Sequence, residues 1–67
     1  MDFELKGEYI EMNKLLKITY LVGTGGEANI RIAEGEVEYN GQVDTRKRLK
    51  VRKGDRVVFQ ETEINVI

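Results

Sequence analysis

The stretch "TRKRLKVRKGDR", residues 45–56, concentrates the positive charge of this 67-residue chain. It holds seven of the eleven Lys and Arg residues and only one of the twelve Asp and Glu residues, whereas the whole chain has a net charge of −1. A segment with an excess of one sign creates a local potential that attracts the opposite charge, whatever the net charge of the molecule. The chemistry that this segment offers is therefore the binding of a polyanion.

Alternation within this segment would align four of its cations. If residues 46–52 are extended, Leu49 and Val51 face the core and the cations between them project from the opposite face. We name these four cations the basic ridge: Arg46, Arg48, Lys50 and Arg52. Alternate side chains of a strand repeat at about 6.6 Å, so the ridge could contact several phosphates of one nucleic-acid backbone. Lys47 interrupts the alternation and is expected near the preceding bend.

Two other roles for the basic ridge stay open. Basic side chains on an exposed strand also keep it soluble and discourage edge-to-edge pairing with another chain. The ridge could instead bind an acidic partner, which would make the chain a protein–protein interaction module. Four aligned cations that include three arginines favour phosphate over simple solubilisation, because the planar arginine fork matches phosphate oxygens.

The composition argues against catalysis. The sequence contains no His, Ser, Cys, Trp or Pro, so the common acyl-transfer nucleophiles, the neutral-pH general base and the commonest metal ligand are missing. No pair of the remaining reactive side chains has a recognisable catalytic spacing, and so short a chain has little room for a water-excluding pocket. We therefore expect a protein that is not an enzyme and that holds no cofactor or metal.

Other features limit the class of protein. Without cysteine, neither disulfides nor thiolate–metal sites can support the fold. The chain opens with acidic residues and has no run of about 20 apolar residues, so we expect neither a secretory signal nor a membrane span. These features predict one small soluble domain, residues 1–67, in the cytoplasm.

Two short helices are expected before the basic segment. Residues 11–20 have apolar side chains at helical spacing. Thr24 and Glu27 form a capping-box pattern, in which each side chain can accept a hydrogen bond from an amide at the start of a helix. Gly35 lies where a left-handed residue often ends a helix. The second helix is therefore predicted to begin at Thr24 and to stop at Gly35.

Strands are expected on both sides of the helices. Residues 2–6 alternate apolar and charged side chains, and Asn40–Gly41 is the strongest short signal for a tight hairpin turn. Residues 49–59 are typical of two strands joined by a polar turn at 53–55, and residues 64–67 of a last strand. The order β-α-α-β-β-β-β predicts an α+β fold, with two packed helices against a small, mostly antiparallel sheet of about five strands.

The helices add weaker candidates for anion contact. Lys14 and Lys17 lie one turn apart, although Glu11 can partly neutralise Lys14. Gly25–Gly26 leave amide N–H groups uncovered at the positive end of the second helix, where a phosphate can bind. Alternatively, these glycines let the two helices approach closely. Tyr39 could stack on a base, but its position favours a core or partly buried role.

Residues 11–59 resemble the S-four RNA-binding domain, the small module named after ribosomal small-subunit protein four. The resemblance rests on "LLK", "GGEA", "EGEVEYNG" and "TRKRLKVRKGD", and is greatest to the short, free-standing bacterial members. It implies a monomer that binds structured RNA, such as rRNA or tRNA, on the exposed side of the helices and the loop after the hairpin. Together with the basic ridge, the implied contact residues are Lys14, Lys17, Thr24, Gly25, Gly26, Arg46, Lys47, Arg48, Lys50 and Arg52.

Three positions depart from the family's pattern. Arginine is common where this chain has Glu11 and Gly25, and shorter members tend to carry lysine where it has Asn29. More of the expected contact therefore falls on residues 46–50. A ubiquitin-like sulfur carrier is a further alternative, suggested by the size and by "KGDRVVF", but that class needs a C-terminal Gly-Gly tail and this chain ends "EINVI".

Overall fold

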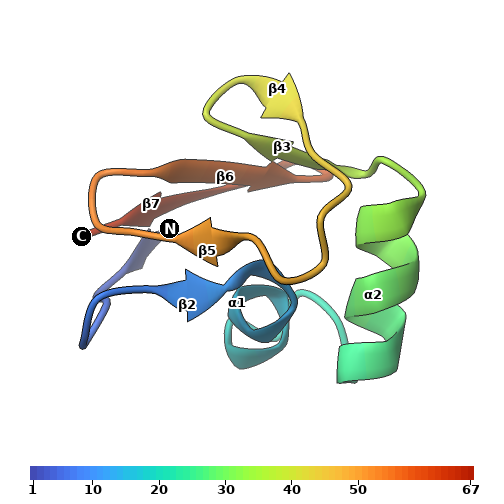
Figure 1. Cartoon of the computed structure of the whole chain (residues 1–67), viewed down its shortest axis with the longest axis horizontal. Helices are drawn as coiled ribbons and strands as arrows, with labels where there is room; N and C mark the ends of the chain where they lie inside the picture. The colour runs from blue at the N-terminus through green and yellow to red at the C-terminus, as the bar shows by residue number, and fades with distance from the viewer.

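The computed structural model describes residues 1–67 as two helices and seven short strands (Figure 1). Neither helix is long and apolar enough to cross a membrane. In chain order the elements are β1 (Asp2–Phe3), β2 (Ile10–Glu11), α1 (Met12–Ile18), α2 (Gly25–Ala33), β3 (Val37–Tyr39), β4 (Gln42–Val43), β5 (Lys50–Val51), β6 (Arg56–Phe59) and β7 (Thr62–Val66).

Five strands form the main sheet in the order β1-β7-β6-β3-β4. β1 pairs with β7 in parallel, and the other pairs are antiparallel. The β3–β4 hairpin turns at Asn40 and Gly41, whose φ angles of 50° and 91° form the left-handed pair that a tight type I′ turn needs. The predicted α+β fold and its hairpin are confirmed. The β6–β7 hairpin turns at Gln60, also with a positive φ of 55°, which its sequence did not predict because glutamine is not a typical turn residue.

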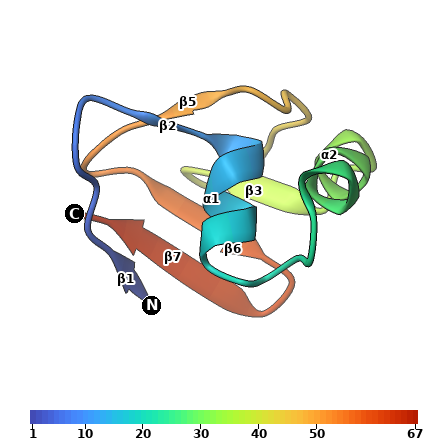
Figure 2. The ribbon, with the colours of Figure 1, turned by 90° about the horizontal axis from the view of Figure 1, so that it is seen from below.

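The core lies between one face of this sheet and the two helices. Figure 2 shows α1 lying across the sheet, with α2 beside it at one side. All thirteen buried side chains are apolar, so burial of hydrophobic surface holds the layers together. They are Leu5, Met12, Leu15, Leu16, Val22, Ala28, Ile32, Val37, Val51, Val57, Phe59, Ile64 and Val66.

A separate two-stranded sheet positions the end of the basic segment. β2 and β5 pair antiparallel, with Ile10 opposite Val51 and Glu11 opposite Lys50. Val51 is buried, whereas Lys50 and its second neighbour Arg52 are exposed. The sequence did not predict β2, because a strand of two residues gives no alternating pattern to recognise.

The two ends of α2 follow the predicted signals. Thr24 is the N-cap, and its hydroxyl oxygen accepts a hydrogen bond from the Glu27 amide at 3.0 Å. The Glu27 carboxylate accepts from the Gly23 amide at 2.9 Å rather than from Thr24 itself. At the other end Gly35 has φ +82°, and the amides of Gly35 and Glu36 donate to carbonyls of the last turn, as in a Schellman motif.

A side-chain hydrogen bond ties the helices together. Asn13 Nδ2 on α1 donates to Asn29 Oδ1 on α2 at 3.0 Å. Asn29 stands where shorter members of the resembled family tend to carry lysine. In this chain that position serves helix packing instead of offering a positive charge.

Candidate nucleic-acid interface

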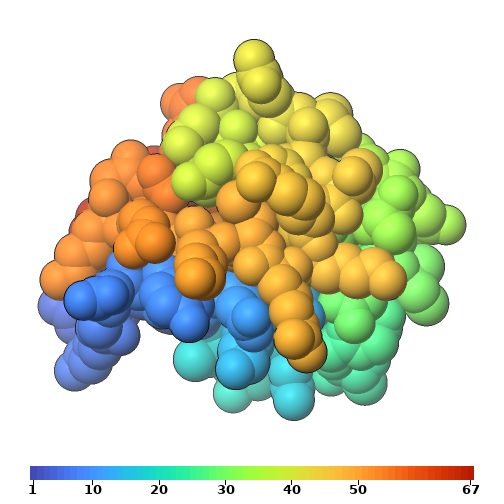
Figure 3. Space-filling view, in the orientation of Figure 1, coloured from blue at the N-terminus to red at the C-terminus, as the bar shows by residue number.

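The basic ridge lies on one exposed surface of the molecule. Its four cations and the partly buried Leu49 surround a single open hollow of about 550 Å³. In Figure 3 the yellow to orange segment that carries them crosses the visible face, above the blue and cyan residues of β2 and α1 and next to the green α2. The structure therefore brings together Arg46, Arg48, Lys50 and Arg52, as the sequence predicted.

The backbone that carries the ridge differs from the prediction. The expected extended run over residues 46–52 is wrong for its first half, because residues 47 and 48 form a turn and the Leu49 amide donates to the Arg46 carbonyl at 3.3 Å. Only Lys50–Val51 is a strand. Lys47 lies in the turn itself, close to where its break in the alternation suggested.

Helix α1 accounts for this turn. Its N-cap, Glu11, makes no capping hydrogen bond with its side chain. Instead the amides of Met12 and Asn13 donate to the carbonyls of Leu49 and Lys47, at 2.9 and 3.0 Å. The first amides of a helix need such acceptors, so the basic segment bends around the start of α1 and caps it.

Arg46 differs from the other three cations of the ridge. Its Nε and Nη2 atoms donate to Asp44 Oδ1 and Oδ2 at 3.0 and 2.7 Å. This bidentate contact raises the pKa of Arg46 and lowers the pKa of Asp44. The five ion pairs of the structure include none of the other ridge cations. Three of the four ridge cations therefore have no carboxylate partner, although Arg52 Nη1 donates to the Glu8 carbonyl at 3.5 Å.

An aromatic ring that the sequence did not predict borders the basic ridge. Tyr9 lies just before β2 and is 43% exposed. The centre of its ring is 5.0 Å from Lys50 Nζ and 5.8 Å from Arg52 Cζ, within the range of cation–π interactions. Only the pairing of β2 with β5 reveals this neighbourhood, and the sequence carries no signal for that pairing.

The two lysines of α1 lie outside the ridge hollow. Lys14 and Lys17 are exposed and line a different hollow with Ile10, Ile18 and Tyr20. Lys14 Nζ is 3.7 Å from the Glu11 carboxylate, as the sequence predicted. An exposed ion pair of this kind is weak, but it lowers the local positive potential on α1.

The start of α2 does not support the packing role considered for its glycines. A Cβ added to Gly25 would meet no atom within 4 Å, and one added to Gly26 would meet only the Thr24 hydroxyl, at 3.9 Å. Close approach of the helices therefore does not require these glycines, and that interpretation is wrong. Their amides lie in the first turn, where no helical carbonyl can accept from them, but the Glu27 carboxylate lies at the same helix end.

Tyr39 has the structural role that its position favoured. Its hydroxyl donates to Asp55 Oδ2 at 2.6 Å, and this bond raises the pKa of Tyr39. Asp55 also accepts from the Arg52 amide and from Asn40 Nδ2. Burial opposes ionisation of Asp55, but these hydrogen bonds outweigh it and lower its pKa. The Asp55 network therefore holds the turn that follows the ridge.

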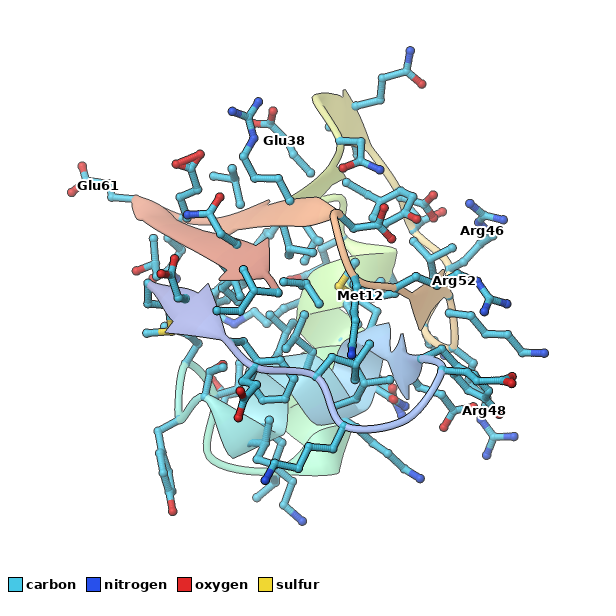
Figure 4. All side chains as sticks on the ribbon, turned by 90° about the vertical axis from the view of Figure 1, so that its left-hand side faces the viewer. Met12, Glu38, Arg46, Arg48, Arg52 and Glu61 are labelled. Carbon is cyan, nitrogen blue, oxygen red and sulfur yellow. The ribbon has the colours of Figure 1, made fainter.

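Acidic side chains of the main sheet lie away from the ridge. In Figure 4 the labelled Glu38 and Glu61 project from a different side of the molecule than Arg46, Arg48 and Arg52. No group of three or more acidic side chains is close enough together to hold a metal ion. Glu38 and Glu61 are therefore separated in space from the labelled arginines of the ridge, whereas Asp44 and Glu11 lie beside ridge cations.

Known proteins are similar to this chain in sequence and in fold. YbcJ of Escherichia coli K12 and YbcJ of Shigella flexneri are each 39% identical to this chain over 62 residues, which cover 92% of this chain and 89% of theirs. The solution structure of E. coli YbcJ matches with a TM-score of 0.75, over 98% of this chain and 85% of that one. It is described as revealing an ALFAL motif involved in RNA-binding.

A family comparison agrees with the resemblance carried by the basic segment and the helices. The sequence model of the S4 domain family, which is the S-four family, matches residues 3–67. This range includes both helices, strands β2 to β7 and the whole basic ridge. The chain therefore belongs to the S4 domain family.

Proposed function

We propose that this protein binds structured RNA, such as rRNA or tRNA, by contacting its phosphate backbone with the basic ridge. The observation that carries the proposal is the placement of Arg48, Lys50 and Arg52 around one hollow, exposed and without a carboxylate partner. The RNA-binding motif described for YbcJ supports the same class of partner. Contacts to phosphate position a protein on RNA without reading its bases, so the affinity for unrelated sequences should be similar.

The helices extend the proposed surface at both sides of the ridge. Lys47 adds charge from the turn, and Lys14 and Lys17 add charge from α1. Thr24 and the amides of Gly25–Gly26 border the start of α2, but the Thr24 hydroxyl already accepts from Glu27. We assign the helical residues a smaller share of the affinity than the ridge. A single domain acting as one copy is sufficient for this mode of binding.

Salt dependence of binding tests the proposal directly. A protein that neutralises phosphates releases counterions, with a slope of about −0.7 to −0.9 in log affinity against log salt for each contact. Three to four ridge contacts predict a slope between about −2 and −4. The measurement is a fluorescence anisotropy titration of a labelled RNA hairpin between 50 and 300 mM KCl, with circular dichroism to confirm folding.

The control for this titration is a ridge variant with Arg48, Lys50 and Arg52 changed to glutamate. It should bind the hairpin weakly and with little salt dependence, because the contacts that release counterions are lost. An affinity of the wild-type protein that does not change with salt would contradict the mechanism. Retained binding to acidic proteins after nuclease treatment, without RNA binding, would favour the protein–protein interaction module instead.

A further inference from the structure

Packing in the core does not explain the exposed ring of Tyr9. Tyr9 is neither one of the thirteen buried core residues nor one of the partly buried residues packed against them. The other two tyrosines differ from it. Tyr39 is held by Asp55 through its hydroxyl, and Tyr20 is 90% exposed without a cation over its ring. Tyr9 alone combines an exposed aromatic ring with two ridge cations.

The pairing of β2 with β5 determines this arrangement. Since Ile10 lies opposite Val51, Tyr9 continues the ladder toward Arg52, and Lys50 is the diagonal neighbour on the same face. Lys50 and Arg52 are both exposed, and their charged groups lie over the Tyr9 ring, so they can bind phosphates next to it. Tyr9 also lines a second open hollow, together with Ile10, Glu11 and Lys14.

We propose that Tyr9 stacks on one unpaired base of the bound RNA, while Lys50 and Arg52 bind the phosphates next to that nucleotide. The inference rests on the proposed function and specifies the class of RNA. Bases inside an A-form duplex are stacked on their neighbours and are read poorly from its grooves. An exposed aromatic ring beside cations instead suits a base that is unstacked. The preferred RNA is therefore a duplex interrupted by an unpaired nucleotide, and not a continuous helix.

The test compares two RNA hairpins that differ in one nucleotide. One hairpin is fully paired, and the other carries a single bulged 2-aminopurine, whose fluorescence is quenched when it stacks. Tyr9→Ala should reduce the affinity for the bulged hairpin about tenfold, within the range measured for loss of one aromatic–base stack. It should change the affinity for the paired hairpin less than twofold, and it should abolish the quenching on binding.

Two further variants serve as controls for the ring itself. Tyr9→Phe keeps the aromatic face and should retain both affinity and quenching. Tyr20→Ala removes an equally large exposed side chain that has no cation over its ring, and should leave binding of both hairpins within twofold of wild type. Because Tyr9 is exposed and outside the core, circular dichroism should show that Tyr9→Ala remains folded.

The outcomes separate the inference from the proposed function. An equal loss for both hairpins with Tyr9→Ala would mean that Tyr9 only orients Lys50 and Arg52, and would overturn the inference. Unchanged binding and quenching in Tyr9→Ala would also overturn it, although a loss of binding in the ridge variant would leave the proposed function intact. If wild-type protein bound neither hairpin at 50 mM salt, the proposed function itself would fail.

Discussion

Replacing Asp44 by asparagine should strengthen RNA binding. In the folded protein the Asp44 carboxylate accepts two hydrogen bonds from the Arg46 guanidinium. The Arg46 side chain is 68% exposed. A phosphate of the RNA must compete with this carboxylate for the same guanidinium fork. The substitution Asp44→Asn removes the negative charge, but the new amide oxygen can still accept from the Arg46 amide as Asp44 Oδ1 does at 3.0 Å. The turn should therefore persist while Arg46 becomes free.

The expected gain follows from the number of phosphate contacts. One additional contact makes the salt slope more negative by about 0.7 to 0.9. If Asp44→Asn and wild type bind equally at 1 M salt, this difference in slope makes the affinity of Asp44→Asn about five- to eightfold higher than that of wild type at 0.1 M salt. The value is an upper limit, because the wild-type Arg46 can also leave Asp44 when a phosphate is present. The gain should fall as salt is raised, since the added contact is screened.

The assay is the same hairpin titration at four salt concentrations, with Glu61→Gln as the matched control. Glu61 is exposed, forms no ion pair and lies on a different side from the arginines, so its neutralisation changes the net charge by the same amount without releasing Arg46. Asp44→Asn should exceed this control in both affinity and slope. Equal effects of the two variants would refute the reasoning, because they would show that only net charge matters. A loss of affinity in Asp44→Asn would show that Asp44 orients Arg46 for binding.

Three other predictions concern the division of the surface and the stability of the fold. Changing Arg46, Arg48 and Lys50 to glutamate should weaken RNA binding more than changing Lys14 and Lys17 to glutamate, because Glu11 already offsets Lys14. Fluorescence anisotropy measures both affinities, and a larger loss in the α1 variant would contradict the ridge as the main contact. Thr24→Ala should lower the free energy of unfolding by about 1 kcal/mol, whereas an unchanged midpoint in urea denaturation would show that the Thr24 cap is not stabilising. The pKa of Asp55 in the folded protein is lower than the ordinary aspartate pKa of about 4. The free energy of unfolding should therefore fall as the pH drops from about 4 toward the folded pKa, because protonation of Asp55 removes a stabilising charge. Asp55→Asn should flatten this part of the curve in denaturant titrations across pH 2–7, and an unaltered curve would exclude Asp55 as its source.

The sequence predicted the elements whose signals are local. The Thr24 cap, the left-handed Gly35 and the Asn40–Gly41 turn each depend on residues within one turn of the chain, and each lies where its pattern indicated. The grouping of the ridge cations was also predictable, since they are close in sequence. The extended backbone assumed for them was not correct, because the carbonyls of residues 47 and 49 cap a helix more than thirty residues earlier.

The features that the sequence could not reveal are those that depend on contacts between distant segments. The β2–β5 ladder joins Ile10 to Val51, and only through it does Tyr9 reach the two ridge cations. The Asp44–Arg46 pair is local, yet nothing in the sequence indicates that the arginine turns toward this carboxylate instead of solvent. Both features bear on the proposed RNA surface, because one adds an aromatic ring to it and the other withdraws a charge from it.

The placement of the acidic residues has a consequence for how an RNA would approach. The chain has a net charge of −1, so its long-range attraction for a polyanion is small. Near the surface, however, the ridge attracts phosphate while the side that carries Glu38 and Glu61 repels it. A nonspecific cation-rich protein gains affinity from many orientations, whereas the proposed ridge surface would provide it from a single orientation. Binding should therefore depend on a few contacts at the ridge, which is why the release of one arginine from Asp44 is expected to produce a measurable change.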